Sequence, residues 1–480
     1  MTTNNILLST DSYKITHWKQ YPKGTSEIYS YFESRGGLFK QTLFFVLQYQ
    51  IKKYLLGQVV TKQKIDEARE LSSKHFGNDK MFNYEDWIHI LKHHKGVLPV
   101  RIKAVPEGCV VPVSNVLMTV ENTDKRVPWL TNYLESILAQ NWYPTTVATL
   151  SREIKKLIFQ YLVATGTPEA VDFKLHDFGL RGATSLESSA IGGLAHLINF
   201  KGTDTLPALK LAKDYYGLTN DVAGFSVPAS EHSTITSWGR ACEIEAFRNM
   251  LEQYKDMPIV ACVSDSYDIY NACEDLWGRA LKDTILARDG MLVVRPDSGD
   301  PVTVILKCLE ILGNKFGYEV NEKGYKVLNP KVRIIQGDGV DYDSIKAILE
   351  EMRQAQWSAD NIGFGMGGAL LQKVNRDTQK FAFKCSNIIR EGVSEPVYKD
   401  PVTDKGKSSK KGKLKLTLIG SKEGTFFETI SDKDTNNFEG FTDVLKEVFL
   451  DGELKKEYNF EEVRKNSTKD TMFWDLPRIE

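Results

Sequence analysis

The chain has few cysteines, no excess of charge of either sign and no long apolar run. Its 480 residues include six cysteines, and none forms a CxxC pair or lies beside a histidine at a zinc-like spacing. This scarcity argues against a disulfide framework and is typical of reduced, mostly buried thiols. The 62 basic and 63 acidic side chains give a formal net charge of −1 at pH 7. The composition therefore predicts neither nucleic acid nor an anionic membrane as a partner.

Segments that would direct or anchor the chain are also lacking. No stretch is apolar and long enough to cross a bilayer, and the start, MTTNNILLSTDSYK, carries no basic region of a signal peptide. We therefore expect a cytoplasmic protein without a membrane association. The pair His93-His94 follows a helical pattern and precedes Lys95-Gly96, so a helix C-terminus explains it better than a metal site.

What is present is an ordinary globular composition, with 41% hydrophobic residues and a length that suits two or three domains. The first part, residues 1–148, mixes helices with strands. Apolar residues at three- and four-residue spacing predict helices over 41–56, 62–75, 84–94, about 129–140 and 146–162. β-Branched runs bounded by Pro, Gly and Asn predict strands within 25–35, 98–108 and 109–122.

From residue 149 to residue 376 the pattern becomes a repeat of short apolar strands and helices. Each strand ends in a polar or glycine-rich turn, as in IVACVS before DSYDIYN and VRIIQGDGVD before YDSIKAILEE. Such repetition predicts a parallel sheet buried on both faces. A barrel is favoured over an open doubly wound sheet, because five or more strands each contribute polar residues at their carboxyl ends. The fold class is therefore α/β with a barrel-like domain.

The pattern changes again in residues 377–480. Strands are predicted within 381–392 and 395–401, and Asp451-Gly452 predicts a hairpin turn. Between them, residues 399–416 form the basic, flexible segment KDPVTDKGKSSKKGKLKL. A charge run of this kind is usually a solvated hairpin loop, and the functional alternative is an arm that binds phosphate.

The stretch GFSVPASEHSTITSWG, residues 224–239, has the composition of a reactive site. His232 lies where a helical pattern begins, and helix N-termini favour anions. A nitrogen nucleophile at an anion site could accept a phosphoryl group. The simpler alternative is a helix cap with His232 on the surface.

Further candidates follow the predicted strands of the repeat. Gly337-Asp338-Gly339 and Gly365-Met366-Gly367-Gly368 are turns whose backbone N–H groups could line a phosphate. Arg295-Pro296-Asp297 could bind a phosphate and a ribose diol together, although a local ion pair is the plainer interpretation. Asp265 could orient a histidine or face Mg²⁺. Phe178 offers a stacking ring and Arg181 a planar anion fork.

Long strings of the chain resemble the nicotinamide phosphoribosyltransferase family, a group of type II phosphoribosyltransferases. They include STDSYKITHWKQYP, KLHDFGLRG, NFKGTDT, SVPASEHSTITSWG, RPDSG and IQGDGVD, and the likeness extends from about residue 5 to about residue 465. The resemblance implies that nicotinamide and 5-phosphoribosyl-1-pyrophosphate are joined to give nicotinamide mononucleotide and pyrophosphate. It also implies Mg²⁺ as cofactor, ATP as co-substrate through a phosphohistidine, and a second, α+β domain built from the segments 1–148 and 377–480. Family members are homodimers with active sites at the interface.

The resemblance also assigns roles to residues of this sequence. His232 would be phosphorylated, oriented by Asp265, with Asp297 as the third catalytic group. The remaining assignments concern binding. Phe178 and Tyr13 of the partner subunit would hold nicotinamide, and Asp204 would bind its carboxamide. Arg181 and Arg295 would hold the pyrophosphate and the surroundings of the nicotinamide ring, and Asp297, Gly337 and Asp338 would bind the ribose. Gly368 and Arg376 of the partner subunit would hold the 5′-phosphate, and Lys384, Lys399 and Lys407 of the partner subunit would face phosphates. Pro296 and Gly367 are further substrate-binding residues. The metal ligands are not assigned.

Some positions depart from the family pattern, and other functions remain open. Leu180 replaces a usual Tyr, Met366 a Ser, Ala369 a Gly and Ala382 a Ser, of which the last three bear on phosphate binding. The nearest alternative is a nicotinate or quinolinate phosphoribosyltransferase. A barrel hydrolase using Asp265 and Asp297 as paired carboxylates is a second alternative. A non-catalytic nucleotide-binding or signalling protein is the third.

Overall fold

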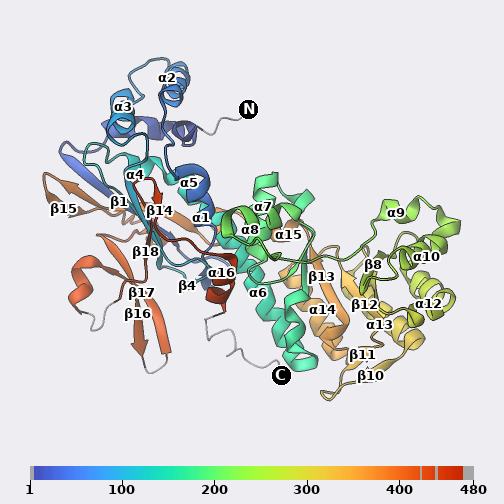
Figure 1. Cartoon of the computed structure of the whole chain (residues 1–480). Helices are drawn as coiled ribbons and strands as arrows, with labels where there is room; N and C mark the ends of the chain where they lie inside the picture. Colours follow the sequence, from blue (N-terminus) through green and yellow to red (C-terminus); the bar gives the residue numbers. More distant parts are fainter. Residues whose placement is uncertain (1–4, 422–423, 438–441, 469–480) are drawn as a thin grey trace. The chain divides into compact units, whose positions relative to one another are not determined.

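The chain folds into two compact units, seen in a computed structural model that describes residues 5–421, 424–437 and 442–468 (Figure 1). Within these residues the first unit comprises 5–149, 215–217 and 375–468, and the second comprises 150–214 and 218–374. The first unit thus takes its chain from both ends of the sequence. No helix of the described ranges combines the length and apolarity that spanning a membrane requires.

The first unit is built on a seven-stranded sheet with strand order β15-β14-β1-β5-β3-β18-β19. Its strands are β1 (Thr25–Ser34), β3 (Val100–Ala104), β5 (Val116–Asn122), β14 (Phe381–Arg390), β15 (Val393–Pro396), β18 (Lys446–Leu450) and β19 (Glu453–Leu454). Every pairing in it is antiparallel, and β1 lies between β14 and β5. Phe32 of β1 stacks on Phe381 at 5.1 Å between ring centroids, in a core that both ends of the chain supply.

Helices and two small sheets complete the first unit. The helices are α1 (Leu47–Gln50), α2 (Lys62–Phe76), α3 (Tyr84–His93), α4 (Leu130–Tyr133), α5 (Glu135–Leu138) and α16 (Phe460–Ser467); the small sheets pair β2 (Gln41–Leu43) with β4 (Val110–Pro112) and β16 (Leu414–Ser421) with β17 (Gly424–Ser431). The predicted helices at 62–75 and 84–94 are confirmed as α2 and α3. The long helix α6 (Trp142–Thr165) runs from the first unit into the second.

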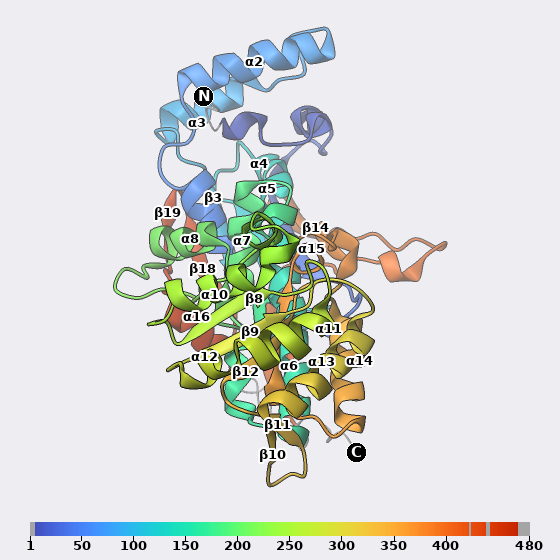
Figure 2. The same cartoon turned by 90° about the vertical axis from the view of Figure 1, so that its right-hand side faces the viewer.

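The second unit contains a six-stranded parallel sheet with the order β7-β6-β13-β12-β9-β8. Its strands are β6 (Leu175–Asp177), β7 (Gly202–Thr203), β8 (Ile259–Val263), β9 (Met291–Arg295), β12 (Val332–Gln336) and β13 (Ile362–Met366). The connecting helices are α7 (Leu186–His196), α8 (Leu206–Tyr216), α9 (His232–Thr236), α10 (Glu243–Gln253), α11 (Ile269–Asn271), α12 (Lys282–Ala287), α13 (Pro301–Phe316), α14 (Tyr342–Gln354) and α15 (Gly368–Leu371), with a hairpin of β10 (Tyr318–Val320) and β11 (Lys326–Leu328). Of these helices, α13 packs against β12 and against α14, beside which it lies in Figure 2.

The two outer strands of this sheet are joined by an irregular segment, residues 225–230. Phe225 forms a parallel bridge with Gly202 of β7, and Ala229 forms one with Ala261 of β8. The backbone N–H of Thr203 donates to Phe225 O at 3.0 Å, and that of Ser230 donates to Ala261 O at 3.0 Å. The segment thereby links both edges of the sheet. The predicted α/β class with a barrel-like domain is confirmed.

The structure corrects several predicted elements. The helix predicted over 41–56 is wrong in its first part, because Gln41–Leu43 pairs with Val110–Pro112 as a strand, and the helix begins only at Leu47. The helical pattern after His232 is divided into α9 and α10 by a turn at Gly239, whose φ of 81° suits glycine. In the basic segment 399–416, Lys405–Lys407 forms a 3₁₀ turn and Leu414 begins β16.

Candidate active site

The polar residues singled out in the repeat follow six parallel strands at the same end. Asp177 ends β6 and precedes Phe178; the other positions are Asp204 after β7, Asp265 after β8, Arg295-Pro296-Asp297 at the end of β9, Gly337-Asp338 after β12 and Gly367-Gly368 after β13. Because the strands are parallel, their carboxyl ends meet at one edge of the sheet, which is where barrel enzymes bind their substrates. The fold thus brings these residues to a single face of the second unit.

His232 is held by two carboxylates at this face. Its Nε2 lies 2.9 Å from Asp265 Oδ1, and its Nδ1 lies 3.9 Å from Asp297 Oδ2. The Asp265 side chain is 4% exposed, whereas that of His232 is 46% exposed. Ser298 Oγ donates to the second oxygen of Asp265. A buried, fixed carboxylate beside Nε2 favours the tautomer that carries its proton on that nitrogen, which leaves the lone pair on Nδ1.

The position of His232 depends on the sheet more than on a helix dipole. His232 is the first residue of α9, as predicted, but α9 has only five residues, so its macrodipole is small. The segment 225–230 positions His232 instead. Two residues before His232, the backbone N–H of Ser230 donates to Ala261 O of β8, and Ser230 Oγ accepts from the backbone N–H of Val263.

Asp297 is the acid at the centre of the group. Arg295 Nη2 lies 3.4 Å from Asp297 Oδ2, so the local ion pair is present. Burial raises the pKa of Asp297; Arg295 opposes this shift, and the negative charges of Asp265 and Asp338 add to it. Pro296, which lies between Arg295 and Asp297 in the sequence, is buried, and Asp338 is exposed. Repulsion among carboxylates of this kind favours a bound cation or a ligand that donates hydrogen bonds.

The ring of Phe178 occupies space that two glycines leave free. A Cβ on Gly365 would lie 1.9 Å from Phe178 Cε2, and a Cβ on Gly337 would lie 3.5 Å from the same atom. The backbone N–H of Phe178 donates to Met366 O at 3.0 Å, which fixes the start of the turn. Gly365 is therefore required for the ring position, a role for which its place in a glycine-rich turn is the sequence signal.

Asp204 is linked to this ring through His176, and its carboxyl group has a lowered pKa. Its backbone N–H donates to Asp177 O at 3.0 Å, and its Oδ1 lies 2.9 Å from His176 Nε2. Ser226 Oγ donates to the same Oδ1. Burial raises the pKa of Asp204, but the interactions with His176, Ser226 and Arg295 together outweigh it, and the net shift is downward. His176 also lies 5.1 Å from Phe178 between ring centroids, so one histidine contacts both groups.

Sequence reasoning missed the supporting roles of His176 and Ser226. A signal for the first exists at Gly202, where a Cβ would lie 2.7 Å from His176 Nδ1. Glycine in the string KGTDT therefore makes room for this imidazole. Ser226 gives no comparable signal, because only the bridge between 225–230 and β7 brings it to Asp204.

The second glycine turn leaves open space at its end. A Cβ on Gly368 would meet no heavy atom within 4 Å, and Gly367 precedes it at the start of α15. A Cβ on Gly182 would approach Gly368 Cα to 3.3 Å, so the turn carrying Arg181 packs against this one. Arg181 itself is exposed in the 3₁₀ turn Leu180–Gly182.

In the first unit, four of the predicted residues line one basic cavity of about 490 Å³. They are Arg376, Lys384, Lys399 and Lys407, joined by Arg35 and Lys380, which sequence reasoning missed, and by the acids Glu135, Asp377 and Asp404. Burial lowers the pKa of Lys384; Glu135 opposes the shift, and Arg35, Arg376 and Lys399 add to it. The cavity therefore has a positive excess suited to anions.

Tyr13 is not among the residues that line this cavity. It is 58% exposed in the 3₁₀ helix Ser12–Lys19.

Comparison with known proteins connects these features to a family. The profile of the nicotinate phosphoribosyltransferase (NAPRTase) family matches residues 173–453, and that of the nicotinamide phosphoribosyltransferase N-terminal domain matches residues 5–102. The chain belongs to the nicotinate phosphoribosyltransferase family. A protein of Xanthomonas campestris pv. campestris (strain 8004) named nicotinamide phosphoribosyltransferase is 51% identical over 96% of this chain and 97% of its own length. One of the same name from Acinetobacter baylyi is 33% identical over 96% of each chain.

Solved structures support the fold of this phosphoribosyltransferase. The nicotinate-nucleotide pyrophosphorylase of Pyrococcus furiosus superposes with a TM-score of 0.57 at 14% identity, over 99% of this chain and 98% of that one. Human nicotinic acid phosphoribosyltransferase gives the same TM-score and identity, over 95% and 92%. The family inferred from the sequence strings is thus confirmed, and the chain is an enzyme of the phosphoribosyl-transferring class.

Proposed function

We propose that this phosphoribosyltransferase joins nicotinamide to 5-phosphoribosyl-1-pyrophosphate, releasing nicotinamide mononucleotide and pyrophosphate for NAD salvage. The observation that supports nicotinamide is the carboxylate of Asp204 bonded to His176, whose ring lies 5.1 Å from that of Phe178 between centroids. An ionised carboxylate accepts a hydrogen bond from a carboxamide N–H and repels the carboxylate of nicotinate. The names of the relatives agree with this choice.

The proposed reaction displaces pyrophosphate from the anomeric carbon by the pyridine nitrogen. Phe178 would hold the flat base in line, supplying orientation. Arg295 and Arg181 would stabilise the charge that develops on the leaving pyrophosphate, and Asp297 and Asp338 would accept hydrogen bonds from the ribose hydroxyls. Gly337, Gly367 and Gly368 would let the backbone approach the ribose and the 5′-phosphate closely.

Mg²⁺ fits this group of acids. Proteins bind Mg²⁺ through one or two carboxylates together with substrate phosphates. Burial raises the pKa of Asp297, and the neighbouring Asp265 and Asp338 raise it further, so a divalent cation would relieve their mutual repulsion. Asp297 and Asp338 are the residues that would face the ion. When bound, Mg²⁺ neutralises charge on the pyrophosphate.

ATP would act through His232. Nδ1 of His232 attacks the γ-phosphorus of ATP, the bond to the β–γ bridging oxygen breaks, and ADP leaves with that electron pair. Asp265 keeps the other nitrogen protonated throughout. The phosphohistidine adds negative charge at the face where Arg295 lies, and its later hydrolysis couples ATP to the equilibrium of the transfer.

The first unit would serve the active site of a second copy of the chain. The cavity lined by Arg376, Lys384, Lys399 and Lys407 offers the cations that phosphates require, and Tyr13 is an exposed ring that could cover a base. We propose a homodimer in which Tyr13 and these four cations come from the partner subunit. All six cysteines are free thiols, which supports a reducing compartment such as the cytoplasm.

An assay of the purified chain tests the proposal. Nicotinamide, the pyrophosphorylated ribose and Mg²⁺ are incubated with and without ATP, and nicotinamide mononucleotide is measured; nicotinate replaces nicotinamide in a parallel reaction. We expect the mononucleotide in the first reaction, more of it with ATP, and little product from nicotinate. Faster turnover of nicotinate would instead support the alternative of a nicotinate phosphoribosyltransferase, the activity in the name of the human structural neighbour.

A further inference from the structure

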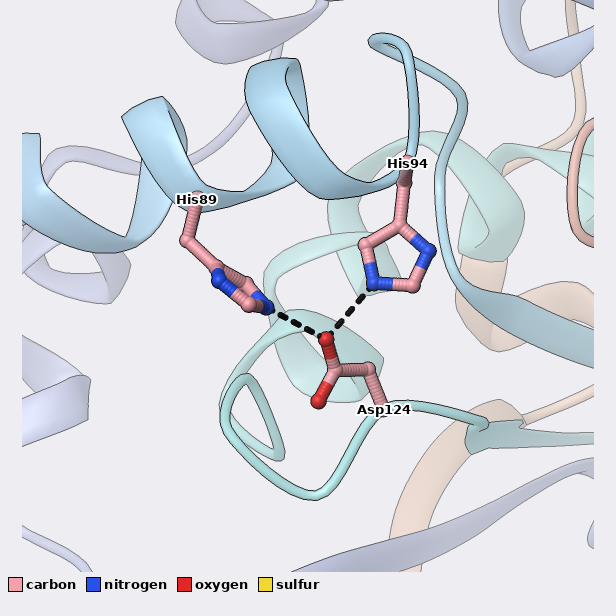
Figure 3. A group of neighbouring side chains, drawn as sticks. All are labelled: His89, His94 and Asp124. Carbon is pink, nitrogen blue, oxygen red and sulfur yellow. Dashed lines mark hydrogen bonds and ion pairs between the residues drawn. The ribbon is translucent and has the colours of Figure 1, made fainter.

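Three side chains of the first unit converge on one point outside the candidate active site (Figure 3). His89 lies in α3, His94 follows the last turn of that helix, and Asp124 lies in the turn after β5. Nε2 of His89 and Nε2 of His94 each lie 2.6 Å from Asp124 Oδ2. Among the described residues these are the three side chains whose nitrogen and oxygen atoms could share a metal ion.

The backbone on both sides fixes this arrangement. Asn122 Nδ2 donates to Asp124 O at 2.9 Å, and the backbone N–H of Arg126 donates to Asp124 Oδ1 at 2.9 Å. Oδ1 is thus occupied, and Oδ2 is directed at the two histidines. The helix ends where the sequence predicted. His94 is its C-cap and still donates its backbone N–H to Ile90 O at 3.0 Å, and the chain turns away only at Lys95, whose φ is 54°.

The geometry and exposure of the group suit a cation. Asp124 is the single carboxylate of the group, and its Oδ2 faces both Nε2 atoms. The side chains of His89, His94 and Asp124 are 14%, 26% and 18% exposed. Partial exposure leaves an open side from which water could complete a coordination shell.

We propose that His89, His94 and Asp124 bind one divalent transition-metal ion, best fitted by Zn²⁺, through the two Nε2 atoms and Oδ2. Two imidazoles and one carboxylate are a ligand set that zinc takes in proteins, with water as the fourth ligand. Ligand atoms around tetrahedral zinc lie roughly 3.3 Å apart, so the three groups would separate by several tenths of an ångström as the ion replaces the shared hydrogens.

The site would tie the end of α3 to the turn at Asp124. His89 Nδ1 is buried and has no hydrogen-bond partner in the described part of the chain. In a strong zinc site, the ring nitrogen of each histidine that does not bind the metal normally forms a hydrogen bond. We therefore expect affinity in about the micromolar range rather than the much tighter binding of a zinc finger.

The test uses the full chain, freed of metal with a chelator and then titrated with Zn²⁺ or Co²⁺. The variants are His94→Gln and Asp124→Asn, and the matched control is His75→Gln, an exposed histidine on α2. A second control, His232→Ala, removes the histidine of the other candidate site. We expect one Zn²⁺ per chain and a visible Co²⁺ spectrum of nitrogen ligation in the unmodified chain and both controls, and loss of that site in both variants. Zn²⁺ should also raise the melting temperature only where the site is intact.

Equal Zn²⁺ uptake by all five proteins, or none by the unmodified chain, would overturn the proposal and leave a hydrogen-bonded His–Asp–His group. Melting curves of the metal-free variants establish that they fold. A further measurement needs only the unmodified chain and does not depend on the folding of the variants. Co²⁺ should broaden the ring NMR signals of His89 and His94 and spare that of His75. Excess Mg²⁺ should not compete, because it prefers oxygen ligands.

Discussion

His232 derives its chemistry from the residues that hold it rather than from its own type. Asp265, 4% exposed, contacts Nε2 at 2.9 Å and is itself held by Ser298. We expect γ-labelled ATP to leave acid-labile label on the unmodified chain and none on His232→Ala. Asp265→Asn should reduce the rate of labelling at least tenfold, because the tautomer is no longer enforced.

His75→Ala, at an exposed position on α2, is the control for this labelling and should keep the full rate. Label that persists in His232→Ala would exclude this residue as the phosphoryl acceptor.

Asp204 is the residue expected to select the base. Hydrogen bonds to a charged group contribute about 1.5–3 kcal/mol, and about 1.4 kcal/mol corresponds to a factor of ten. Asp204→Asn keeps the shape and removes the charge, so kcat/KM on nicotinamide should fall roughly 10- to 100-fold while the preference over nicotinate shrinks. Steady-state kinetics on both bases measure the change. Asp214→Asn, which removes an exposed acid paired with Lys210, should alter neither, and an unchanged preference in Asp204→Asn would refute the assignment.

The ring of Phe178 offers a test with a control in the same strand. In Gly365→Ala the new Cβ would lie 1.9 Å from Phe178 Cε2, whereas in Gly363→Ala the nearest atom is Ile335 Cγ1 at 4.0 Å. We expect Gly365→Ala to displace the ring and raise KM for nicotinamide at least tenfold, because the stacking face is lost. Gly363→Ala should leave KM close to normal. Equal KM values in the two variants would show that the ring does not bind the base.

At the scale of elements, the turn between β18 and β19 shows how a short motif determines local structure. Asp451 has φ of 49° and Gly452 has φ of 84°, the two positive values of a type I′ turn, as the dipeptide predicted. A Cβ on Gly452 would also lie 2.6 Å from Val97 Cβ. The turn therefore closes a hairpin and packs against the chain before β3.

Gly452→Ala should destabilise the fold by roughly 2–4 kcal/mol, the sum of left-handed strain and steric overlap. Gly57→Ala is the matched control, since Gly57 has φ of 69° but its Cβ would meet nothing within 4 Å. That variant should lose only about 1–2 kcal/mol. Chemical unfolding followed by circular dichroism gives both free energies, and equal losses would mean that the overlap with Val97 is relieved without cost.

At the scale of the whole molecule, the proposed dimer predicts complementation between subunits. Arg376→Ala would remove a cation supplied to the partner's site, and Asp297→Ala would disable a chain's own site. Each homodimer should be nearly inactive. Randomly mixed chains should recover roughly one quarter of normal activity, because half of the dimers carry one intact site of two. Absence of recovery, with subunit exchange verified by mass spectrometry of differently tagged chains, would mean that each site is built from one chain.

Much of the molecule follows from the sequence alone. Short apolar strands followed by polar turns predicted the parallel sheet and the gathering of Asp265, Asp297, Gly337 and Phe178 at one edge, because the alternation of strands with helices and the side-chain period are both visible in the local sequence. The same reasoning failed at 41–56, where a helical pattern continued into residues that pair as strand β2. A local pattern cannot report the partner strand at Val110–Pro112, some seventy residues away.

Only the tertiary structure decided which distant residues meet. His176 joins Phe178 to Asp204, the segment 225–230 brings Ser226 to Asp204 and His232 to Asp265, and Asp124 completes a group with His89 and His94. The contacts of Asp204, His232 and Asp124 join residues 22 to 35 positions apart, a separation that carries no periodic signal, and each depends on how strands and turns pack. The sequence by itself determined the elements and the chemical types at their ends; the distances, burial and charges that make them a site arise from the fold.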